Sequence, residues 1–369
     1  MMGYNTVTLP DYSVGEGCYR EIPHAARHFG KKAVVIGGKT AMSKAKEKLL
    51  DGIKGSDMEI TDFLWYGGQA TYENGDRLME EEAVKSADIL FAVGGGRACD
   101  TVKYMADKMD KPLFCFPTVA SNCAAVTTIS VIYNPDGSLR EYYFPKIADH
   151  TFIETSIIAD SPRELLWAGI GDALSKEYES KYASTGLELS HTPLMGVQLG
   201  GICSGPLLRY GKKALEAIEQ KKSTYELEQT ALDIIISTGL VSNMVTHLPE
   251  YYYNSSIAHC VYNGSTVTPG SHRHLHGEIV SLGTLVQLTA AGEYELRDRI
   301  AEFNYSLGLP VCFADIDIRK EEFPAIIERA QTTTEWKYRP ESRQITKEKL
   351  LEWMTETDRF GEAYKMNRK

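Results

Sequence analysis

Up to residue 160, short apolar runs alternate with longer segments whose apolar positions recur every three or four residues. The apolar runs are rich in β-branched side chains and end near Gly or Pro. They predict strands at Lys32–Ile36, Glu59–Leu64, Ile89–Val93 and Leu113–Phe116. The segments between them predict helices at Met42–Leu50, Tyr72–Lys85 and Arg97–Met109. Strand–helix–strand alternation of this kind predicts a parallel sheet covered by helices on both faces.

Two later features extend this pattern and then end it. The turn sequence Asn134-Pro135-Asp136-Gly137 separates the β-rich runs Ser130–Tyr133 and Glu141–Phe144, which predicts an appended β-hairpin. From Asp160 onward the helical spacing prevails. We therefore expect an α/β domain of the nucleotide-binding type at residues 1–160, followed by an all-helical domain at residues 161–369.

Helix-start signals mark the second half of the chain. Ser161-Pro162-Arg163-Glu164 combines an N-cap residue, a Pro at the first helical position and a capping-box Glu. Ser223-Thr224-Tyr225-Glu226 is a second capping box, ahead of the apolar stretch Leu232–Val245. Further helices are predicted at His276–Ala291, at Arg319–Ala330 and from Lys347 onward.

Composition and charge narrow the class of protein. The chain has 369 residues, 43% of them hydrophobic and 24% charged, which is typical of a globular protein. Its net charge is −10 and no block of Lys and Arg offsets it, so we expect no nucleic-acid partner. No apolar run approaches the ~20 residues of a membrane helix, so we expect no membrane partner either.

The N-terminus and the cysteines indicate the compartment. The first residues have neither a basic nor an apolar region, so we expect no signal peptide. The seven cysteines are scattered and form no CxxC motif, which is typical of reduced thiols. We therefore expect a cytoplasmic enzyme with a small-molecule substrate, and homo-oligomers are common among such enzymes.

Glycines follow two of the predicted strands. Gly94, Gly95 and Gly96 connect the strand ending at Val93 to a helix, an arrangement that lets the backbone approach a pyrophosphate. They do not form the GxGxxG dinucleotide fingerprint, so a plain tight turn is an open alternative. Gly37 ends another strand and Lys39 follows it, with no carboxylate nearby. A cation at such a strand end suits a 2′-phosphate, which favours NADP(H) over NAD(H), although a solvated lysine explains it equally well.

One carboxylate and two imidazoles on separate predicted helices are candidates for a metal site. These are Asp172, His259 and His276, which together would bind a divalent cation and leave positions open for substrate. The sequence does not show that they converge. His272 and His274 precede His276 in an HxHxH run, and we interpret them as loop residues rather than ligands.

Five segments resemble the iron-containing alcohol dehydrogenase superfamily, specifically its glycerol dehydrogenase-like branch. They are GGGRACDTVKYMAD (94–107), PTVASNCAAVTTISVIYNPDG (117–137), AGIGDALSKEYES (168–180), AHCVYNG (258–264) and HGEIVSLGTLVQL (276–288). They occur in the family order with family-like spacings. The resemblance implies a dehydroquinate synthase-like fold, with a dinucleotide-binding domain, a helical domain and a catalytic metal in the cleft between them.

The resemblance also implies roles for individual residues. Asp172, His259 and His276 would be the metal ligands. The residues that would line the pyrophosphate are Gly94, Gly95, Gly96, Arg97 and Asp100. Those that would contact the nicotinamide side of the cofactor are Thr118, Thr127, Ile129 and Tyr133.

Departures from the family pattern bear on the substrate. Cys123 stands where glycerol dehydrogenases carry an Asp that hydrogen-bonds the polyol, and losing that acceptor should weaken diol binding. Three features are similar to the hydroxycarboxylate dehydrogenase subgroup. They are Cys123 with the segment around it, the Gly–Lys end of the second strand, and the spacing between His259 and His276. That subgroup reduces 2-oxo acids with NADPH. We therefore expect a 2-oxo or 2-hydroxy acid substrate and NADP(H).

Departures near the metal bear on the ion and on proton transfer. Lys176 stands where iron-dependent members carry a fourth ligand, a His, so a three-ligand site with Zn²⁺ rather than Fe²⁺ is favoured. Lys176 would pair either with a substrate carboxylate or with Asp172 as an ordinary helix ion pair. Tyr262 replaces a second His that relays a proton in many relatives, which leaves Tyr262, Lys176 or water as the proton donor.

Three alternatives stay open at this point. The first is a glycerol or polyol dehydrogenase that uses NAD. The second is a sugar-phosphate cyclase related to dehydroquinate synthase, which would need a basic phosphate-binding cluster. The third is a non-catalytic binding protein whose metal site has lapsed.

Overall fold

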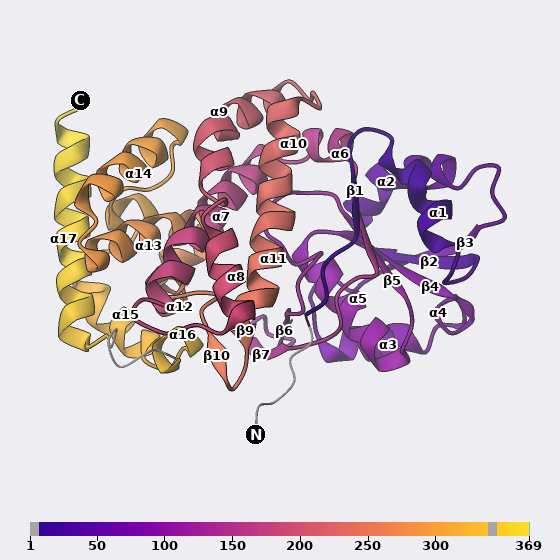
Figure 1. Ribbon diagram of the computed structural model, residues 1–369, viewed down its shortest axis with the longest axis horizontal. Coiled ribbons are helices and arrows are strands. Elements are labelled where there is room, and N and C mark those ends of the chain that lie inside the picture. Colours follow the sequence, from indigo (N-terminus) through magenta and orange to yellow (C-terminus); the bar gives the residue numbers. More distant parts are fainter. Residues whose placement is uncertain (1–6, 339–344, 369) are drawn as a thin grey trace. The chain divides into compact units, whose positions relative to one another are not determined.

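The computed structural model describes residues 7–338 and 345–368 (Figure 1). The chain forms two compact units. The first holds the described residues up to Leu166 together with Lys213–Asn243, and the second holds Trp167–Lys212 and the residues from Met244 onward. This division differs from the expected boundary at residue 160 mainly because Lys213–Asn243 packs with the first unit. No helix in the described ranges is long and apolar enough to cross a membrane.

A six-stranded parallel sheet is the centre of the first unit. In spatial order its strands are β1 (Tyr12–Val14), β8 (His150–Ile153), β5 (Leu113–Pro117), β4 (Ile89–Gly94), β2 (Lys32–Gly37) and β3 (Glu59–Trp65). The four predicted strands are therefore confirmed. The two strands that the pattern missed, β1 and β8, have only three and four residues, too few to display a period.

Helices surround this sheet. They are α1 (Ile22–Ala26) with the 3-10 turn Cys18–Glu21 before it, α2 (Lys39–Gly52), α3 (Tyr72–Met79), α4 (Glu82–Ser86), α5 (Gly96–Met109), α6 (Thr155–Ala159) and α10 (Tyr225–Leu232). The predicted helix Tyr72–Lys85 is in fact two helices, α3 and α4. Leu78 and Val84 are both buried but six residues apart, so one straight helix would not point both inward.

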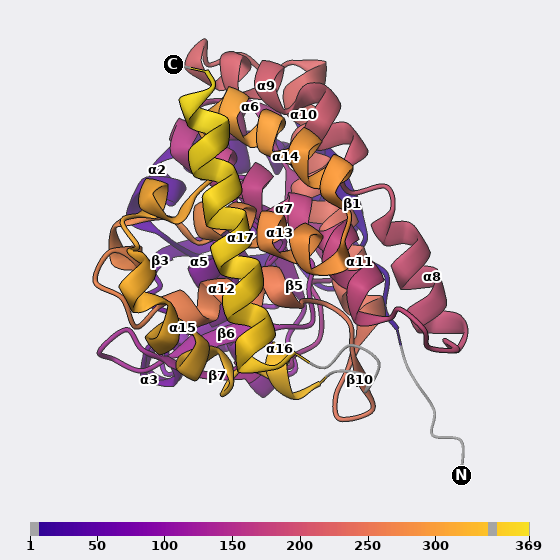
Figure 2. The ribbon, with the colours of Figure 1, turned by 90° about the vertical axis from the view of Figure 1, so that its left-hand side faces the viewer.

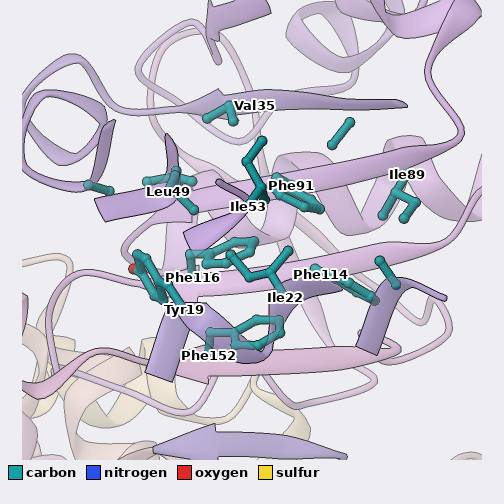
Figure 3. Packing of buried hydrophobic residues seen from close by; sticks show 14 of the residues in the cluster. Tyr19, Ile22, Val35, Leu49, Ile53, Ile89, Phe91, Phe114, Phe116 and Phe152 are labelled. Carbon is teal, nitrogen blue, oxygen red and sulfur yellow. The ribbon is translucent and has the colours of Figure 1, made fainter. Parts of the chain in front are cut away.

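Stacked aromatic rings form the core on one face of the sheet (Figure 3). Phe91 stacks on Phe114 with ring centroids 5.6 Å apart, and Phe116 stacks on Phe152 at 5.1 Å. Tyr19 closes the cluster with its ring edge 5.2 Å from Phe116. This core fixes β4 and β5, and so the positions of the segments that leave their carboxyl ends.

The predicted hairpin is confirmed in the first unit, with β6 (Ser130–Tyr133) antiparallel to β7 (Leu139–Tyr143). Helix α10 is capped by Thr224, whose hydroxyl accepts a hydrogen bond from the Leu227 amide. The capping box predicted from Ser223 is therefore wrong. The Ser223 hydroxyl instead donates to Thr155 Oγ1 at 2.6 Å.

The remaining elements are mostly helices. They are α7 (Arg163–Ala183), α8 (His191–Gly200), α9 (Gly205–Glu219), the π-helix Asp233–Ser237, α11 (Thr238–Val245), α12 (Ile257–Ser265), α13 (His276–Ala291), α14 (Tyr294–Leu307), α15 (Phe323–Ala330), α16 (Thr334–Lys337) and α17 (Lys347–Met366). Short 3-10 turns cover Ser271–Arg273, Phe313–Ile316 and Lys320–Glu322, and β9 (Thr246–His247) pairs with β10 (Tyr251–Tyr252). The predicted helices beginning at His276 and Lys347 are confirmed. Helix α17 lies along α13 and α15 (Figure 2).

Candidate functional site

Three helices of the second unit bring the predicted metal ligands together. Asp172 comes from α7, His259 from α12 and His276 from the first position of α13. Asp172 Oδ1 lies 3.1 Å from His276 Nε2 and 3.4 Å from His259 Nε2. One ligand atom from each residue lies within 4.8 Å of the other two. The convergence that the sequence left open is therefore present in the fold.

Glycines on α13 allow the helices to approach this closely. A Cβ on Gly277 would lie 1.9 Å from the Ala168 carbonyl oxygen of α7, and one on Gly283 would lie 2.5 Å from that of Ala258 in α12. No side chain fits in either space. The two glycines therefore set the separation of α13 from its neighbours, and with it the separation of the three ligands.

A fourth residue, Glu179, completes the cluster, and the sequence reasoning missed it. Its carboxylate is fully buried and accepts hydrogen bonds from His259 Nδ1 at 2.6 Å and from the backbone amides of His259 and Ser256 at 2.9 and 2.6 Å. The His259 ring therefore has its Nδ1 occupied and its Nε2 directed at Asp172. The sequence feature that could have identified Glu179 is its spacing. It lies seven residues after Asp172 and therefore on the same face of the helix.

Electrostatics favour a cation at this point. Burial raises the pKa of Asp172, but the His276 and His259 imidazoles outweigh it and hold the pKa well below its usual range. Burial also opposes ionisation of Glu179, yet His259 holds the pKa of that carboxyl low. The pKa of His259, which burial alone would lower, is raised by Glu179 and Asp172 to about 10. Two carboxylates are thus ionised and concentrate negative charge around the His259 nitrogens.

The donor set fits a divalent cation. Two imidazole nitrogens and one carboxylate oxygen are a ligand combination typical of catalytic zinc, with at least one position left for water or substrate. The Glu179–His259 contact is the usual support of such a site, since it fixes the imidazole tautomer.

Lys176 lies one turn after Asp172 on α7, but the ion pair considered between them is absent. The Lys176 ammonium donates instead to the Asn254 backbone oxygen at 2.9 Å and to Asn254 Oδ1 at 2.6 Å. Lys176 is nevertheless buried. An ammonium has no lone pair to offer a metal, so Lys176 supplies no fourth ligand.

Other polar residues near the cluster have separate partners. The Tyr262 ring packs edge-on against the His276 ring at a centroid distance of 4.1 Å. His274 lies 2.9 Å from Glu278 and 3.1 Å from Asp317, and His272 is exposed. The interpretation of His272 and His274 as loop residues agrees with these contacts.

The predicted glycine turn joins β4 to α5 in the first unit. Gly94 has φ +149°, a backbone conformation that suits glycine, and a Cβ on it would lie 2.9 Å from Ala98 Cβ. Gly95 is the N-cap of α5, and no side chain caps its first amides. A Cβ on Gly96 would lie 3.1 Å from the Asn122 side chain. These open amides and the lack of side chains fit the pyrophosphate of a dinucleotide.

Residues predicted to surround the cofactor lie against this turn and helix. Thr118 donates its backbone amide to the Gly94 oxygen at 3.3 Å. The Arg97 guanidinium lies 6.0 Å from the centre of the Tyr133 ring. The Thr127 and Ile129 carbonyl oxygens accept hydrogen bonds from Lys103 at 3.3 and 2.5 Å.

Asp100, which was also predicted to line the pyrophosphate, lies near the start of α5. Its carboxylate is buried, lies 2.9 Å from the Lys103 ammonium and accepts a hydrogen bond from the Val131 amide at 3.2 Å. Burial raises its pKa despite the neighbouring Lys103. Asp100 and Lys103 together bind the backbone of the segment from Thr127 to Val131.

The second glycine turn follows β2. A Cβ on Gly37 would lie 2.2 Å from the Val93 oxygen, so only glycine fits where β2 meets β4. Lys39 is the first residue of α2, and its ammonium lies 4.5 Å from the centre of the Trp65 ring. That ring contact limits where the Lys39 charge can lie.

Cys123 lies between β5 and β6, half-buried and close to α11. A Cβ on Gly239 of α11 would lie 3.3 Å from Cys123 Cβ. No disulfide joins any of the seven cysteines, all of which fall in the described ranges. This agrees with the reduced thiols expected from the sequence.

Comparison with known proteins gives a consistent result. Residues 10–157 match the family described as iron-containing alcohol dehydrogenase. The chain is 30% identical to a glycerol dehydrogenase of Thermotoga maritima over 81% of this chain and 82% of that protein. It is 29% identical to hydroxycarboxylate dehydrogenase A of Escherichia coli over 78% of each. The crystal structure of glycerol dehydrogenase from Schizosaccharomyces pombe superposes with a TM-score of 0.85 at 24% identity, covering 100% of this chain and 93% of that one.

Proposed function

We propose a reaction for this chain from the premise that it belongs to the iron-containing alcohol dehydrogenase family, in the glycerol dehydrogenase-like branch, and is an oxidoreductase. The proposed reaction is the reversible oxidation of one hydroxyl of a short polyol, with glycerol as the reference substrate. A hydride passes to NAD(P)⁺, one proton is released, and a hydroxyketone forms. Family membership removes the cyclase and the non-catalytic protein from the alternatives.

The observation that carries this proposal is the cluster of Asp172, His259 and His276 supported by Glu179. These residues would hold a divalent cation, which when bound polarises an alcohol or carbonyl oxygen as a Lewis acid. The chain's own contribution is to fix the ligand atoms, with His259 Nδ1 held by Glu179 so that Nε2 is the nitrogen offered to the ion. Tyr262, which packs against His276, is the side chain proposed to exchange the alcohol proton.

Glycerol dehydrogenases among the relatives favour a polyol over the 2-oxo acid expected from the sequence. The 2-oxo or 2-hydroxy acid is kept as a second candidate because of Cys123. This position offers no carboxylate to a diol hydroxyl, and a hydroxycarboxylate dehydrogenase is also among the relatives.

We propose NADP(H) as the preferred dinucleotide and Zn²⁺ as the ion. Lys39 supports the first choice because its cation lies at the first turn of α2, where a 2′-phosphate would meet both the ammonium and the helix amides. The three-ligand donor set supports the second. A cytoplasmic location belongs to the same proposal.

The test uses metal-stripped protein to which Zn²⁺ or Fe²⁺ is returned. Glycerol oxidation is followed with NAD⁺ and with NADP⁺, beside reduction of 2-oxobutanoate with NADH and with NADPH. Metal-dependent turnover of glycerol that Asp172→Asn abolishes is the expected result. Turnover that persists after metal removal, or in Asp172→Asn, would show that the cluster is not the reaction site.

A further inference from the structure

We propose that Lys176 and Asn254 form a subsite for an anionic group of the substrate, specifically a carboxylate on the carbon next to the reacting hydroxyl. This inference rests on the proposed function and names the substrate class within it. Within that function, the favoured substrate is then a short polyol that also carries a carboxylate next to the reacting hydroxyl, as glycerate does.

The position of Lys176 on α7 places it at the metal cluster. Lys176 lies four residues after Asp172 and three before Glu179, so all three share one face of the helix. Four residues correspond to about 6 Å along the helix axis, roughly the length of a two-carbon fragment with its carboxylate. Asp172 and Glu179 both contact His259, so Lys176 lies beside the residues that form the centre.

Lys176 carries a buried charge that no carboxylate of the described chain balances. Its side chain is 7% exposed, and its hydrogen bonds go to two neutral oxygens of Asn254. No carboxylate oxygen of the described residues lies within ion-pair distance of its ammonium. A buried ammonium is costly without an anion, and it has three N–H donors, of which Asn254 takes two. The third donor and the unbalanced charge suit a carboxylate ligand.

Buried contacts on both sides fix the Asn254 segment. The Ser255 hydroxyl donates to Glu335 at 2.9 Å, and the Ser256 amide donates to Glu179 at 2.6 Å. Glu335 is itself buried on α16. Asn254 therefore presents two oxygens from a rigid segment and directs the Lys176 ammonium before any ligand binds.

Charge counting points to the same ligand. A divalent cation contributes +2 and Lys176 +1, while Asp172 and Glu179 contribute −2 and the neutral imidazoles nothing, which leaves about +1. A neutral diol leaves this excess in place. A 2-hydroxy carboxylate cancels it and pairs its second polar group with Lys176.

Pairs of matched substrates separate the effect of the carboxylate on kcat/KM from the effect of the rest of the substrate. Glycerate and glycerol differ by a carboxylate in place of a hydroxymethyl group, as do 2-hydroxybutanoate and butane-1,2-diol. We expect the zinc-loaded enzyme to have the higher kcat/KM for the acid of each pair. In Lys176→Met the acid-to-diol ratio should fall by about 10- to 100-fold, as expected for a lost hydrogen bond to a charged group. The change should lie in the KM of the acid.

Two further variants make the result interpretable. Asn254→Asp is nearly isosteric and supplies an internal carboxylate, so it should lower the acid-to-diol ratio although Lys176 is retained. Lys181→Met removes an exposed lysine of the same helix and should leave the ratio unchanged. If Lys176→Met lowers acid and diol equally, Lys176 has a structural role and the inference is overturned.

Binding measured without turnover decides the inference even if the proposed reaction fails. Zinc-loaded wild type and Lys176→Met are titrated with 2-hydroxybutanoate by calorimetry, with zinc content measured in both. Weaker binding to the variant at equal zinc content supports the subsite. Equal binding overturns it. Absence of turnover for every substrate would overturn the proposed function alone.

Discussion

At the scale of single residues, Glu179 determines how His259 can act. Its carboxylate accepts hydrogen bonds from His259 Nδ1 and from the His259 and Ser256 backbone amides, so the ring is held through Nδ1 and Nε2 remains for an ion. A glutamine there would offer one carbonyl oxygen in place of the two carboxylate oxygens and would lose the charge. The metal affinity should depend on this residue although it is not a ligand.

We expect Glu179→Gln to weaken Zn²⁺ or Co²⁺ binding by about 10- to 100-fold, the usual effect of losing a carboxylate behind a ligating histidine. Titration of the metal-free protein measures the affinity, and the Co²⁺ spectrum reports the geometry. Glu177→Gln is the matched control, since Glu177 lies on the same helix and bonds Ser204 instead. Equal affinities in the two variants would contradict the role given to Glu179.

His150 makes a pH-dependent contribution in the first unit. Burial lowers its pKa, although Asp11 and Glu21 oppose the shift, and its Nε2 lies 2.9 Å from the Ser13 hydroxyl. The unfolded chain binds the proton at a pKa of about 6.5, before the folded chain does. The stabilisation from the neutral ring is therefore complete above that pH and is lost as the pH falls through it.

We accordingly expect the free energy of unfolding to decrease between about pH 8 and about pH 5.5, and to decrease more in the wild type than in His150→Gln. This pH range spans the pKa of histidine in the unfolded chain. Glutamine keeps a partner for Ser13 but does not titrate. Urea unfolding at the two pH values gives the comparison. Parallel pH dependence in both proteins would show that His150 is not the titrating group.

At this scale the sequence predicted the three ligands but not their supporting partners. Asp172, His259 and His276 are recognisable because their residue types suit a metal and their segments resemble a family. Glu179 shares a helix face with Asp172, which is a local signal, but its partner His259 lies far away in the chain. Asn254 is likewise far in the chain from its partner Lys176, and the local pattern identifies neither partner. The contacts of Asp100 with Lys103 and with the Val131 amide likewise appear only in the fold.

At the scale of elements, the packing of α13 on α7 controls the geometry of the metal cluster. Gly277 directly follows His276, a proposed ligand, and Gly171 directly precedes Asp172. Each glycine faces backbone of the other helix, with a Cβ on Gly171 falling 2.5 Å from the Gly277 oxygen. The ligands are therefore adjacent to the points of closest helix approach.

We expect Gly277→Ala to lower the free energy of unfolding by about 1–3 kcal/mol or more, because its methyl group collides with the backbone of α7. Metal affinity should fall as well, since the same displacement separates Asp172 from His276. Thermal unfolding and metal titration measure the two effects. Gly205→Ala on α9 is the control, because no atom lies within 4 Å of its added carbon.

The buried pair of Asp100 and Lys103 joins α5 to the segment before β6. We expect Lys103→Met to cost about 3–5 kcal/mol, because it leaves Asp100 buried without its counter-charge. Replacing both residues, as in Asp100→Leu with Lys103→Met, should recover part of that loss. Lys108→Met, on the exposed end of the same helix, should be nearly neutral. A double variant no more stable than Lys103→Met would argue against the pair.

Elements with several turns or a buried apolar run were predictable, and short or interrupted ones were not. The boundaries of α13 and the starts of β2 and β4 follow from local periodicity. The interruption between α3 and α4 and the short strands β1 and β8 depend on burial against distant segments. Their sequences therefore contain too little local signal.

At the scale of the whole molecule, the two units hold different parts of the proposed chemistry. The glycine turn and Lys39 belong to the first unit, and the proposed metal ligands belong to the second. We expect a chelator to abolish turnover while leaving NADPH binding, measured by nucleotide fluorescence, within about threefold, since the residues proposed to bind the dinucleotide differ from those proposed to bind the ion. Loss of NADPH binding on metal removal would contradict this independence.

The division of the chain into units also constrains its synthesis. Strand β8 completes the sheet at Ile153, yet Asn243, which holds the Val126 oxygen and the Thr128 amide, is made ninety residues later. Between them the ribosome must produce Trp167–Lys212, which belongs to the other unit. A nascent chain released from the ribosome before Asn243 would carry an unfinished first unit. At a synthesis rate of about 5–20 residues per second, the segment that ends at Asn243 is made several seconds after β8. During this interval the first unit is incomplete and is accessible to chaperones.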